Sequence, residues 1–165
     1  MPILDANTFE FFSRSPEQTR RLGIRLGKFL LPGDLICLQG ELGAGKTTLV
    51  QGMAQGWGST DPVSSPTFVL VNVYRRPASG QLFHLDAYRL EGAAEAEELD
   101  LAGLLLEGAL VVEWPERIAP VLPADRLWAQ LEYESEEHRA MRFVAGGGRH
   151  QQLLENLQHA VYGAV

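Results

Sequence analysis

The sequence has a single cysteine, Cys37, among its 165 residues. One cysteine cannot form an internal disulfide, which is typical of proteins in a reducing compartment. Cys37 lies in an apolar run, Leu35 to Leu38, where a small buried side chain is expected rather than a reactive thiol. No apolar run reaches membrane-spanning length, and Asp5 and Glu10 interrupt the N-terminal segment where a signal peptide needs its apolar core. We therefore expect a cytoplasmic protein without a membrane anchor.

The sequence also lacks an excess of basic residues. Lys and Arg together number 14 against 21 Asp and Glu, so the formal net charge is -7 at pH 7. Proteins that bind nucleic acid broadly need a basic surface, so we expect no direct DNA binding, although a local basic patch is compatible with this composition. Hydrophobic residues make up 45% and charged residues 21%, as in ordinary soluble proteins. Length and composition predict one domain over residues 1–165.

The most informative stretch is LICLQGELGAGKTTLV, residues 35–50. Gly40, followed five residues later by Gly45, Lys46 and Thr47, matches G-x-x-x-x-G-K-[ST] with a strand-like run before it and a helix-like segment after it. Small residues keep side chains away, so that backbone N–H groups converge on phosphate oxygens. Lys46 would reach the β- and γ-phosphates, and the Thr47 hydroxyl would bind Mg²⁺. The stretch predicts a nucleotide-binding phosphate loop.

Strand-like and helix-like segments alternate around this loop. Strands are expected at 8–13, 35–38, 68–74, 81–90, 109–112, 127–133 and 141–145, and helices from Pro16, from 45 to 57, from 91 to 106 and from 151 to 162. Ser15 is expected to cap the first helix with Gln18 closing a capping box. A short polar connection joins the third and fourth strands, which predicts a hairpin. The pattern therefore favours an α/β fold whose sheet is partly antiparallel.

Two acidic residues stand at the ends of apolar runs. Asp86 closes LFHLD and Glu113 closes ALVVE. Ligands of open α/β sheets gather beyond the carboxyl ends of strands, so either acid is a candidate to hold Mg²⁺ while the other orients the attacking water. A helix cap or a surface charge is the alternative for each. His84 shares a strand face with Asp86, and we expect it to support the site or pack rather than to bind metal.

Four segments, GELGAGKTT, SPTFVLVNVY, HLDAYRL and VVEWPER, occur in this order. Together they resemble the TsaE (YjeE) family, the small ATPases of bacterial threonylcarbamoyladenosine (t6A) synthesis on tRNA. The resemblance runs from Ser15 to about Arg117, and the combination of SPTF with EWP makes it specific. It implies a P-loop NTPase-like three-layer fold with a mixed parallel/antiparallel central sheet flanked by helices. It also implies Mg²⁺-dependent ATP hydrolysis.

The resemblance assigns roles residue by residue. The positions that match the family's phosphate-binding residues are Gly43, Ala44, Gly45, Lys46, Thr47 and Thr48, with Thr47 and Glu113 on Mg²⁺ and Lys46 and Asp86 matching the groups needed for hydrolysis. Further positions that match its nucleotide site are Ser65 and Thr67, in a switch-like segment with Pro66, then Trp114 close to the nucleotide, and Glu17 and Thr19 near the base.

The resemblance also implies partners. The family's ATPase docks on a complex of TsaD and TsaB, and TsaD transfers the threonylcarbamoyl group to adenosine 37 of tRNA, so tRNA is met through that complex. The ATPase is expected to be weak alone and partner-dependent, because no arginine finger is obvious in the chain. Ser64 stands where many members have a basic residue, and the segment after Pro120 carries no motif that matches.

Three other functions compete with this interpretation. A small-molecule kinase usually needs several arginines over the phosphates, and Arg75, Arg76 and Arg89 are few and scattered. A GTPase needs a guanine-reading N-K-x-D, which the sequence lacks; the D-x-x-G match at Asp100 to Gly103 follows a helical run rather than a strand. A nucleotide-gated binding module without catalysis would not need both acids, and both are present.

Overall fold

The computed structural model describes residues 7–64 and 71–163. The helices are α1 (Pro16–Phe29), α2 (Lys46–Trp57), α3 (Ala93–Glu97), α4 (Leu101–Glu107) and α5 (Gly148–Tyr162), and the 3₁₀ turns are Pro115–Arg117 and Ala119–Val121. The strands are β1 (Thr8–Ser13), β2 (Leu35–Gln39), β3 (Val71–Tyr74), β4 (Gln81–Asp86), β5 (Gly108–Glu113), β6 (Leu127–Tyr133) and β7 (Arg139–Ala145).

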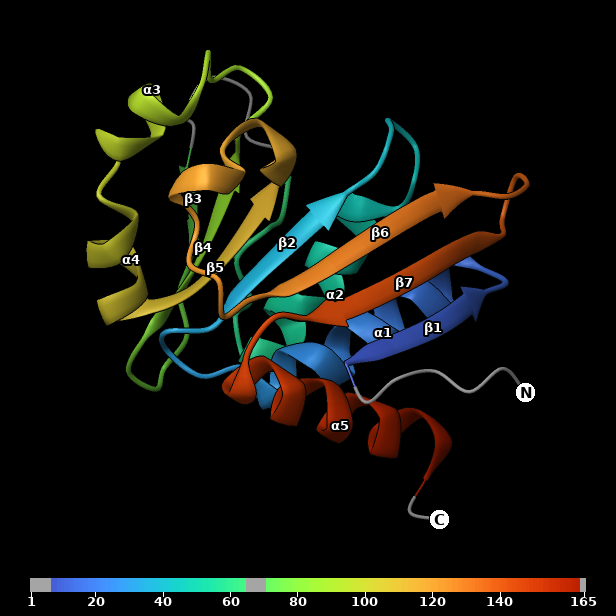
Figure 1. The fold of residues 1–165 in the computed structure, drawn as a ribbon. Coiled ribbons are helices and arrows are strands. Elements are labelled where there is room, and N and C mark those ends of the chain that lie inside the picture. The colour runs from blue at the N-terminus through green and yellow to red at the C-terminus, as the bar shows by residue number, and fades with distance from the viewer. Residues whose placement is uncertain (1–6, 65–70, 164–165) are drawn as a thin grey trace.

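In this part of the chain the strands form one seven-stranded sheet in the order β1-β7-β6-β2-β5-β4-β3 (Figure 1). The centre is parallel, because β2 pairs with both β5 and β6 and β4 pairs with β5 in the parallel sense. The edges are antiparallel at β3–β4, β6–β7 and β1–β7. The expected mixed sheet and the β3–β4 hairpin are therefore confirmed. Residues 68–70 of the expected third strand lie outside the described residues, and the fourth strand, expected over 81–90, ends at Asp86.

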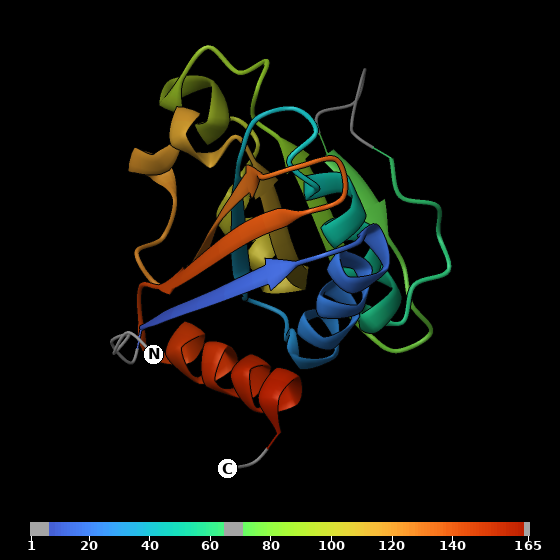
Figure 2. The ribbon, with the colours of Figure 1, turned by 90° about the vertical axis from the view of Figure 1, so that its right-hand side faces the viewer.

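Helices cover both faces of the sheet. Figure 2 shows α1 and α2 side by side on one face, and α5 completes the apolar core on that face. The shorter α3, α4 and the 3₁₀ turns cover the other face over β4, β5 and β2. Burial follows this arrangement: β5 is buried at every position, whereas outward side chains of β6 and β7, such as Gln130 and Arg142, are exposed. A strand buried on both faces is typical of a parallel sheet centre.

Local sequence explains the start of α1. The Ser15 hydroxyl accepts a hydrogen bond from the Gln18 backbone N–H at 3.2 Å, as an N-cap should. The Gln18 side chain in turn accepts from the Arg14 N–H at 2.8 Å, one residue earlier than a standard capping box. Both bonds satisfy donors at the helix start, so the predicted boundary is confirmed.

The helix expected over residues 91–106 is wrong as a single element. The structure has α3 and α4 there, separated at Asp100, whose φ is 51°. The Asp100 carboxylate accepts from the Gly103 N–H at 3.2 Å and so caps a new helix. The terminal helix differs from the prediction in its start, which is Gly148 rather than the expected residue 151. The segment 91–106 is largely helical, as its propensity predicts, but the Asp100 cap starts a second helix within it.

The start of β2 is anchored by a buried polar group. His150 is 2% exposed, and its Nε2 accepts from the Leu35 backbone N–H at 3.0 Å. The ring proton therefore lies on Nδ1, which donates to Asp125 Oδ1 at 2.6 Å. Next to it, Arg149 forms two hydrogen bonds with the buried Asp34 carboxylate. The amino end of α5 thus holds the strand that leads into the phosphate loop.

Helices α1 and α2 approach each other through glycines. An added Cβ at Gly23 or Gly27 of α1 would overlap the backbone carbonyls of Leu49 or Met53, and one at Gly52 of α2 would overlap that of Arg20. No side chain of these glycines separates the helices, so their backbones meet. Since α2 begins at the phosphate loop, this contact positions the loop's helix relative to the sheet.

Gly52→Ala should therefore destabilise the protein by about 1–3 kcal/mol, because the methyl group forces two packed backbones apart. Urea unfolding measures the change. The matched control is Gly148→Ala, at the first residue of α5, where an added Cβ meets nothing within 4 Å. Equal stability of the two variants would contradict the close packing of α1 on α2.

Candidate functional site

The phosphate loop is a turn between the carboxyl end of β2 and the first residue of α2. Gly43 and Gly45 have φ values of 82° and 101°, in the left-handed region that favours glycine. Ala44 between them is buried at 1% exposure. The first N–H groups of α2 lack partners within the helix and carry the positive end of its dipole, which makes this end suited to phosphate. The strand–loop–helix context predicted for the motif is present.

Lys46 folds back over this loop. Its ammonium donates to the Gly40 carbonyl at 2.6 Å and lies 4.1 Å from the centroid of the Trp114 ring. Burial lowers the pKa of Lys46, and the nearby Glu113 and Asp86 carboxylates oppose that shift. As a residue Lys46 is 6% exposed, and its ammonium contacts the Gly40 carbonyl and the Trp114 ring face. A polyphosphate would offer it several charged acceptors at once.

The two candidate acids lie side by side. Asp86 pairs with Glu113 in the register of β4 and β5, and Glu113 pairs with Leu38 of β2. The carboxyl ends of three neighbouring parallel strands therefore meet at the edge that carries the phosphate loop, as expected for open α/β sheets. Glu113 is 5% exposed, whereas Asp86 is half-buried and accepts from the Tyr88 N–H at 2.9 Å.

The Glu113 carboxylate has a buried partner. His84 is fully buried, with its Nε2 2.5 Å from Glu113 Oε2 and its Nδ1 2.8 Å from the Tyr74 hydroxyl. This agrees with the expectation that His84 supports the site or packs. The structure adds that the partner of His84 is Glu113, one of the two acids that the sequence marks as candidates.

Trp114 adopts an uncommon backbone conformation. Its φ of 57° is one of two positive values among the non-glycine residues described. Such a conformation costs about 1–3 kcal/mol and tends to occur at functional sites. The Trp114 ring centroid lies 4.1 Å from the Lys46 ammonium and 5.0 Å from the centroid of the Tyr88 ring. The turn thus places an aromatic face against the lysine of the phosphate loop.

The other residues that the sequence predicts for the nucleotide site differ in where the structure places them. Thr47 and Thr48 lie in the first turn of α2 and are half-buried. Thr19 is buried in α1 and lines a small cavity of about 30 Å³ together with Gly45 and Thr48, whereas Glu17 is exposed and is absent from that lining. Ser65 and Thr67 lie outside the described residues.

Arg139 is a residue that the sequence analysis missed. It begins β7 and lines the same cavity; its Nε donates to the Gly43 carbonyl at 2.9 Å. Its Nη1 donates to the carbonyls of Ser135 and His138, and its guanidinium lies 4.6 Å from the Tyr133 ring centroid. No motif marks Arg139, because only the β6–β7 hairpin brings it to a loop 96 residues earlier.

The donor set suits a magnesium ion. Among residues 7–64 and 71–163, no group of three or more His, Cys, Asp or Glu is arranged to hold a metal. Mg²⁺ at a phosphate loop does not need one, because substrate phosphates, water and one or two carboxylates complete its shell. Thr47 supplies a hydroxyl next to the loop, and Glu113 supplies a carboxylate at the adjoining strand end. These oxygen donors fit the ion.

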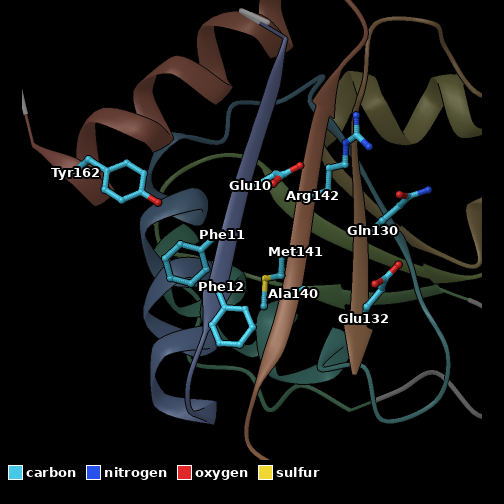
Figure 3. Close-up of a pocket in the computed structure, with 9 residues that line it drawn as sticks. All are labelled: Glu10, Phe11, Phe12, Gln130, Glu132, Ala140, Met141, Arg142 and Tyr162. Carbon is cyan, nitrogen blue, oxygen red and sulfur yellow. The ribbon is translucent and has the colours of Figure 1, made fainter. Parts of the chain in front are cut away.

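Hollows larger than the one beside the loop lie elsewhere. A depression of about 460 Å³ lies on the outer side of β1, β7 and β6, lined by residues such as Glu10, Gln130 and Arg142 (Figure 3). None of the site residues expected from the sequence lines it. Phosphate loops bind with backbone N–H groups at a surface turn, so hollow size is a poor guide here and the loop remains the candidate site.

Known proteins resemble the chain over nearly this whole architecture. The model of the family "Threonylcarbamoyl adenosine biosynthesis protein TsaE" matches residues 13–141. A tRNA threonylcarbamoyladenosine biosynthesis protein TsaE of Bacillus subtilis is 38% identical over 144 residues, covering 87% of this chain and 89% of that protein. One from Streptomyces coelicolor is 48% identical over 115 residues, covering 68% and 78%.

The fold is similar as well. The crystal structure of Bacillus subtilis YdiB superposes with a TM-score of 0.80 at 31% identity, covering 93% of this chain and 96% of that one. The family match extends past the end of the resemblance seen in the sequence, about Arg117, and includes β6, the β6–β7 hairpin and Arg139. Sequence and fold agree that the chain belongs to the TsaE family.

Proposed function

We propose that the chain is a Mg²⁺-dependent ATPase that acts with a TsaB–TsaD-type complex in forming the threonylcarbamoyl group on adenosine 37 of tRNA, without being the transferase. One observation carries the ATPase part: the phosphate loop, Lys46 and the Asp86–Glu113 pair meet at a single edge of the sheet. Family membership supports the tRNA-modification part.

The loop residues, Lys46 and the two acids have distinct roles in this proposal. Backbone N–H groups from Gly43 to Thr48 bind the phosphates, and Lys46 leaves the Gly40 carbonyl to pair with them. Thr47 and Glu113 hold Mg²⁺, which when bound neutralises charge that develops on the phosphate oxygens. Asp86, half-buried at the neighbouring strand end, orients the attacking water.

The position of Asp100 removes the one GTPase-like feature of the sequence, the D-x-x-G match. Asp100, the first residue of the D-x-x-G match, caps α4 through the Gly103 N–H rather than ending a strand. A γ-phosphate sensor of that type needs to stand beside the phosphate loop. The match therefore carries no argument for guanine nucleotides.

The proposal includes dependence on partners and a place of action. Residues 1–165 act as one ATPase domain in the cytoplasm, where turnover is slow alone and changes on docking to the partner complex; tRNA is met through that complex. In the described part of the chain, no helix has the length and apolarity that crossing a membrane requires.

Lys46→Ala should lower ATP affinity or turnover by roughly 100-fold or more, because the phosphate charge loses its buried counter-ion. Titration with a fluorescent ATP analogue and a phosphate-release assay measure this. Lys28→Ala, at the exposed last turn of α1, is the matched control and should behave as the wild type. Unchanged binding in Lys46→Ala would refute the phosphate-loop assignment.

Arg139→Ala should weaken nucleotide binding roughly 3- to 10-fold, the value of one hydrogen bond, because the Gly43 carbonyl loses its donor and the loop is less restrained. The control is Arg142→Ala on the same strand, whose side chain is exposed on the outer face of the sheet. Equal affinities in both variants would show that the hairpin does not restrain the loop.

Phosphate release by the purified protein, alone and with TsaB, TsaD and tRNA, tests the pathway. We expect slow Mg²⁺-dependent turnover that changes when the complex is added. Turnover indifferent to the complex would leave an ATPase outside this pathway, and ATP-dependent product formation on an added metabolite would instead indicate a kinase.

A further inference from the structure

We propose that Tyr74 and His84 form a buried hydrogen-bonded chain that orients the Glu113 carboxylate for a divalent cation, which makes His84 a positioning residue. The inference rests on the proposed function, because it concerns the acid assigned there to Mg²⁺. The observation behind it is the sequence of contacts Tyr74 Oη to His84 Nδ1 at 2.8 Å, then His84 Nε2 to Glu113 Oε2 at 2.5 Å.

The three side chains follow a diagonal across β3, β4 and β5. Tyr74 is opposite Leu82, two residues before His84, and His84 is opposite Val111, two residues before Glu113. Residues two apart on a strand share a face. All three side chains therefore lie on the face that packs against α2, on which the phosphate loop also opens.

Chemistry decides the direction of the hydrogen bonds. A carboxylate only accepts, so His84 must donate its Nε2 proton to Glu113. The Tyr74 hydroxyl has one proton and two acceptors within reach, the Ser64 carbonyl at 3.4 Å and His84 Nδ1 at 2.8 Å. With the imidazole protonated at Nε2 alone, the shorter contact is a hydrogen bond from Tyr74 Oη to Nδ1. Burial raises the pKa of Tyr74, so this hydroxyl keeps the proton that it donates. The chain fixes the tautomer and the plane of the imidazole, and with them one oxygen of Glu113.

Holding one carboxylate oxygen has a consequence for the other. Side-chain rotation moves both oxygens together, so a bond at Oε2 restricts where Oε1 can be. A small ion such as Mg²⁺ demands near-ideal ligand geometry, and hydrogen bonds to ligating carboxylates set it. Any buried carboxylate needs a hydrogen-bond partner. What points to positioning here is that the hydrogen bonds continue beyond His84 to Tyr74 and that the acid they end on stands at the strand end beside the phosphate loop.

The outer end of the hydrogen-bonded chain reaches Ser64. The Ser64 carbonyl lies 3.4 Å from the Tyr74 hydroxyl and accepts from the Asn72 side chain at 3.0 Å. Tyr74 is thus held at β3 by its surroundings as well as by its ring packing against His84, whose centroid is 5.8 Å away. Tyr74 thus has contacts besides His84, with Ser64 and with the apolar core.

The test measures metal binding separately from nucleotide binding. Mn²⁺, followed by electron paramagnetic resonance, is titrated into the protein–ADP complex, and the affinity for a fluorescent ADP analogue is measured in EDTA. His84→Leu should lower Mn²⁺ affinity about 10-fold or more, while affinity for metal-free ADP stays at the wild-type value. Equal losses in both measurements, or no loss of Mn²⁺ affinity, would overturn the proposal.

Two milder variants keep the test decisive if His84→Leu fails to fold. Tyr74→Phe removes only the hydroxyl and should lower Mn²⁺ affinity roughly 3-fold. His84→Gln places an amide N–H near the position of Nε2 and should recover part of the loss seen in His84→Leu. Tyr162→Phe, at an exposed tyrosine of α5, is the matched control for hydroxyl removal.

The two proposals fail in different ways. If the wild type binds no ADP with or without metal, the proposed function and this inference both fall. If the wild type binds ADP more tightly with Mn²⁺ and the Tyr74 and His84 variants bind Mn²⁺ equally well, the ATPase proposal stands and only the positioning role is overturned.

Discussion

A phosphate loop binds its ligand with backbone N–H groups, and this constraint organises the rest of the molecule. The N–H groups must stay uncovered, so the loop cannot be held by side chains that fill it. It is held from its two ends instead, by β2 in the sheet centre and by α2, whose backbone meets that of α1 at Gly23 and Gly52. His150 fixes the amino end of β2. The Gly43 carbonyl accepts a hydrogen bond from Arg139.

Buried charge is the second feature of the sheet edge that carries the phosphate loop. Lys46 and Glu113 are both nearly inaccessible, and burying a charge is costly unless it is paired and hydrogen-bonded. Each has partners: Lys46 has the Gly40 carbonyl and the Trp114 ring, and Glu113 has His84. These partners offset the cost of burying the two charged groups. Under the proposed function, a carboxylate held by His84 loses less conformational freedom when a metal binds.

Much of the fold could be predicted, because its elements carry local signals. The N-cap at Ser15, the apolar run of β2 and the hairpin joining β3 to β4 follow from capping, burial and turn chemistry. The single helix expected over 91–106 was wrong, because propensity does not reveal that the Asp100 side chain caps a second helix. Among site residues, the loop and the acids at the strand ends were predictable, since motif and strand position mark them.

Arg139 is a residue whose contact with the phosphate loop could not be predicted from local sequence patterns. It lies in a segment without a recognisable motif, and nothing close to it in sequence indicates a phosphate loop. Its contact with Gly43 depends on the β6–β7 register and on the sheet order that places β6 beside β2. Sheet order results from the packing of the whole chain, so a contact across it cannot be read from any one segment.

By itself the sequence determined the phosphate loop, the candidate acids Asp86 and Glu113 and the family, because these depend on residue types at short, fixed spacings. Only the tertiary structure decided that the two acids stand in register, that His84 bridges Tyr74 to Glu113, and that Arg139 reaches the loop. These contacts join strands distant in the chain. Their geometry follows from strand pairing and burial, which no local pattern contains.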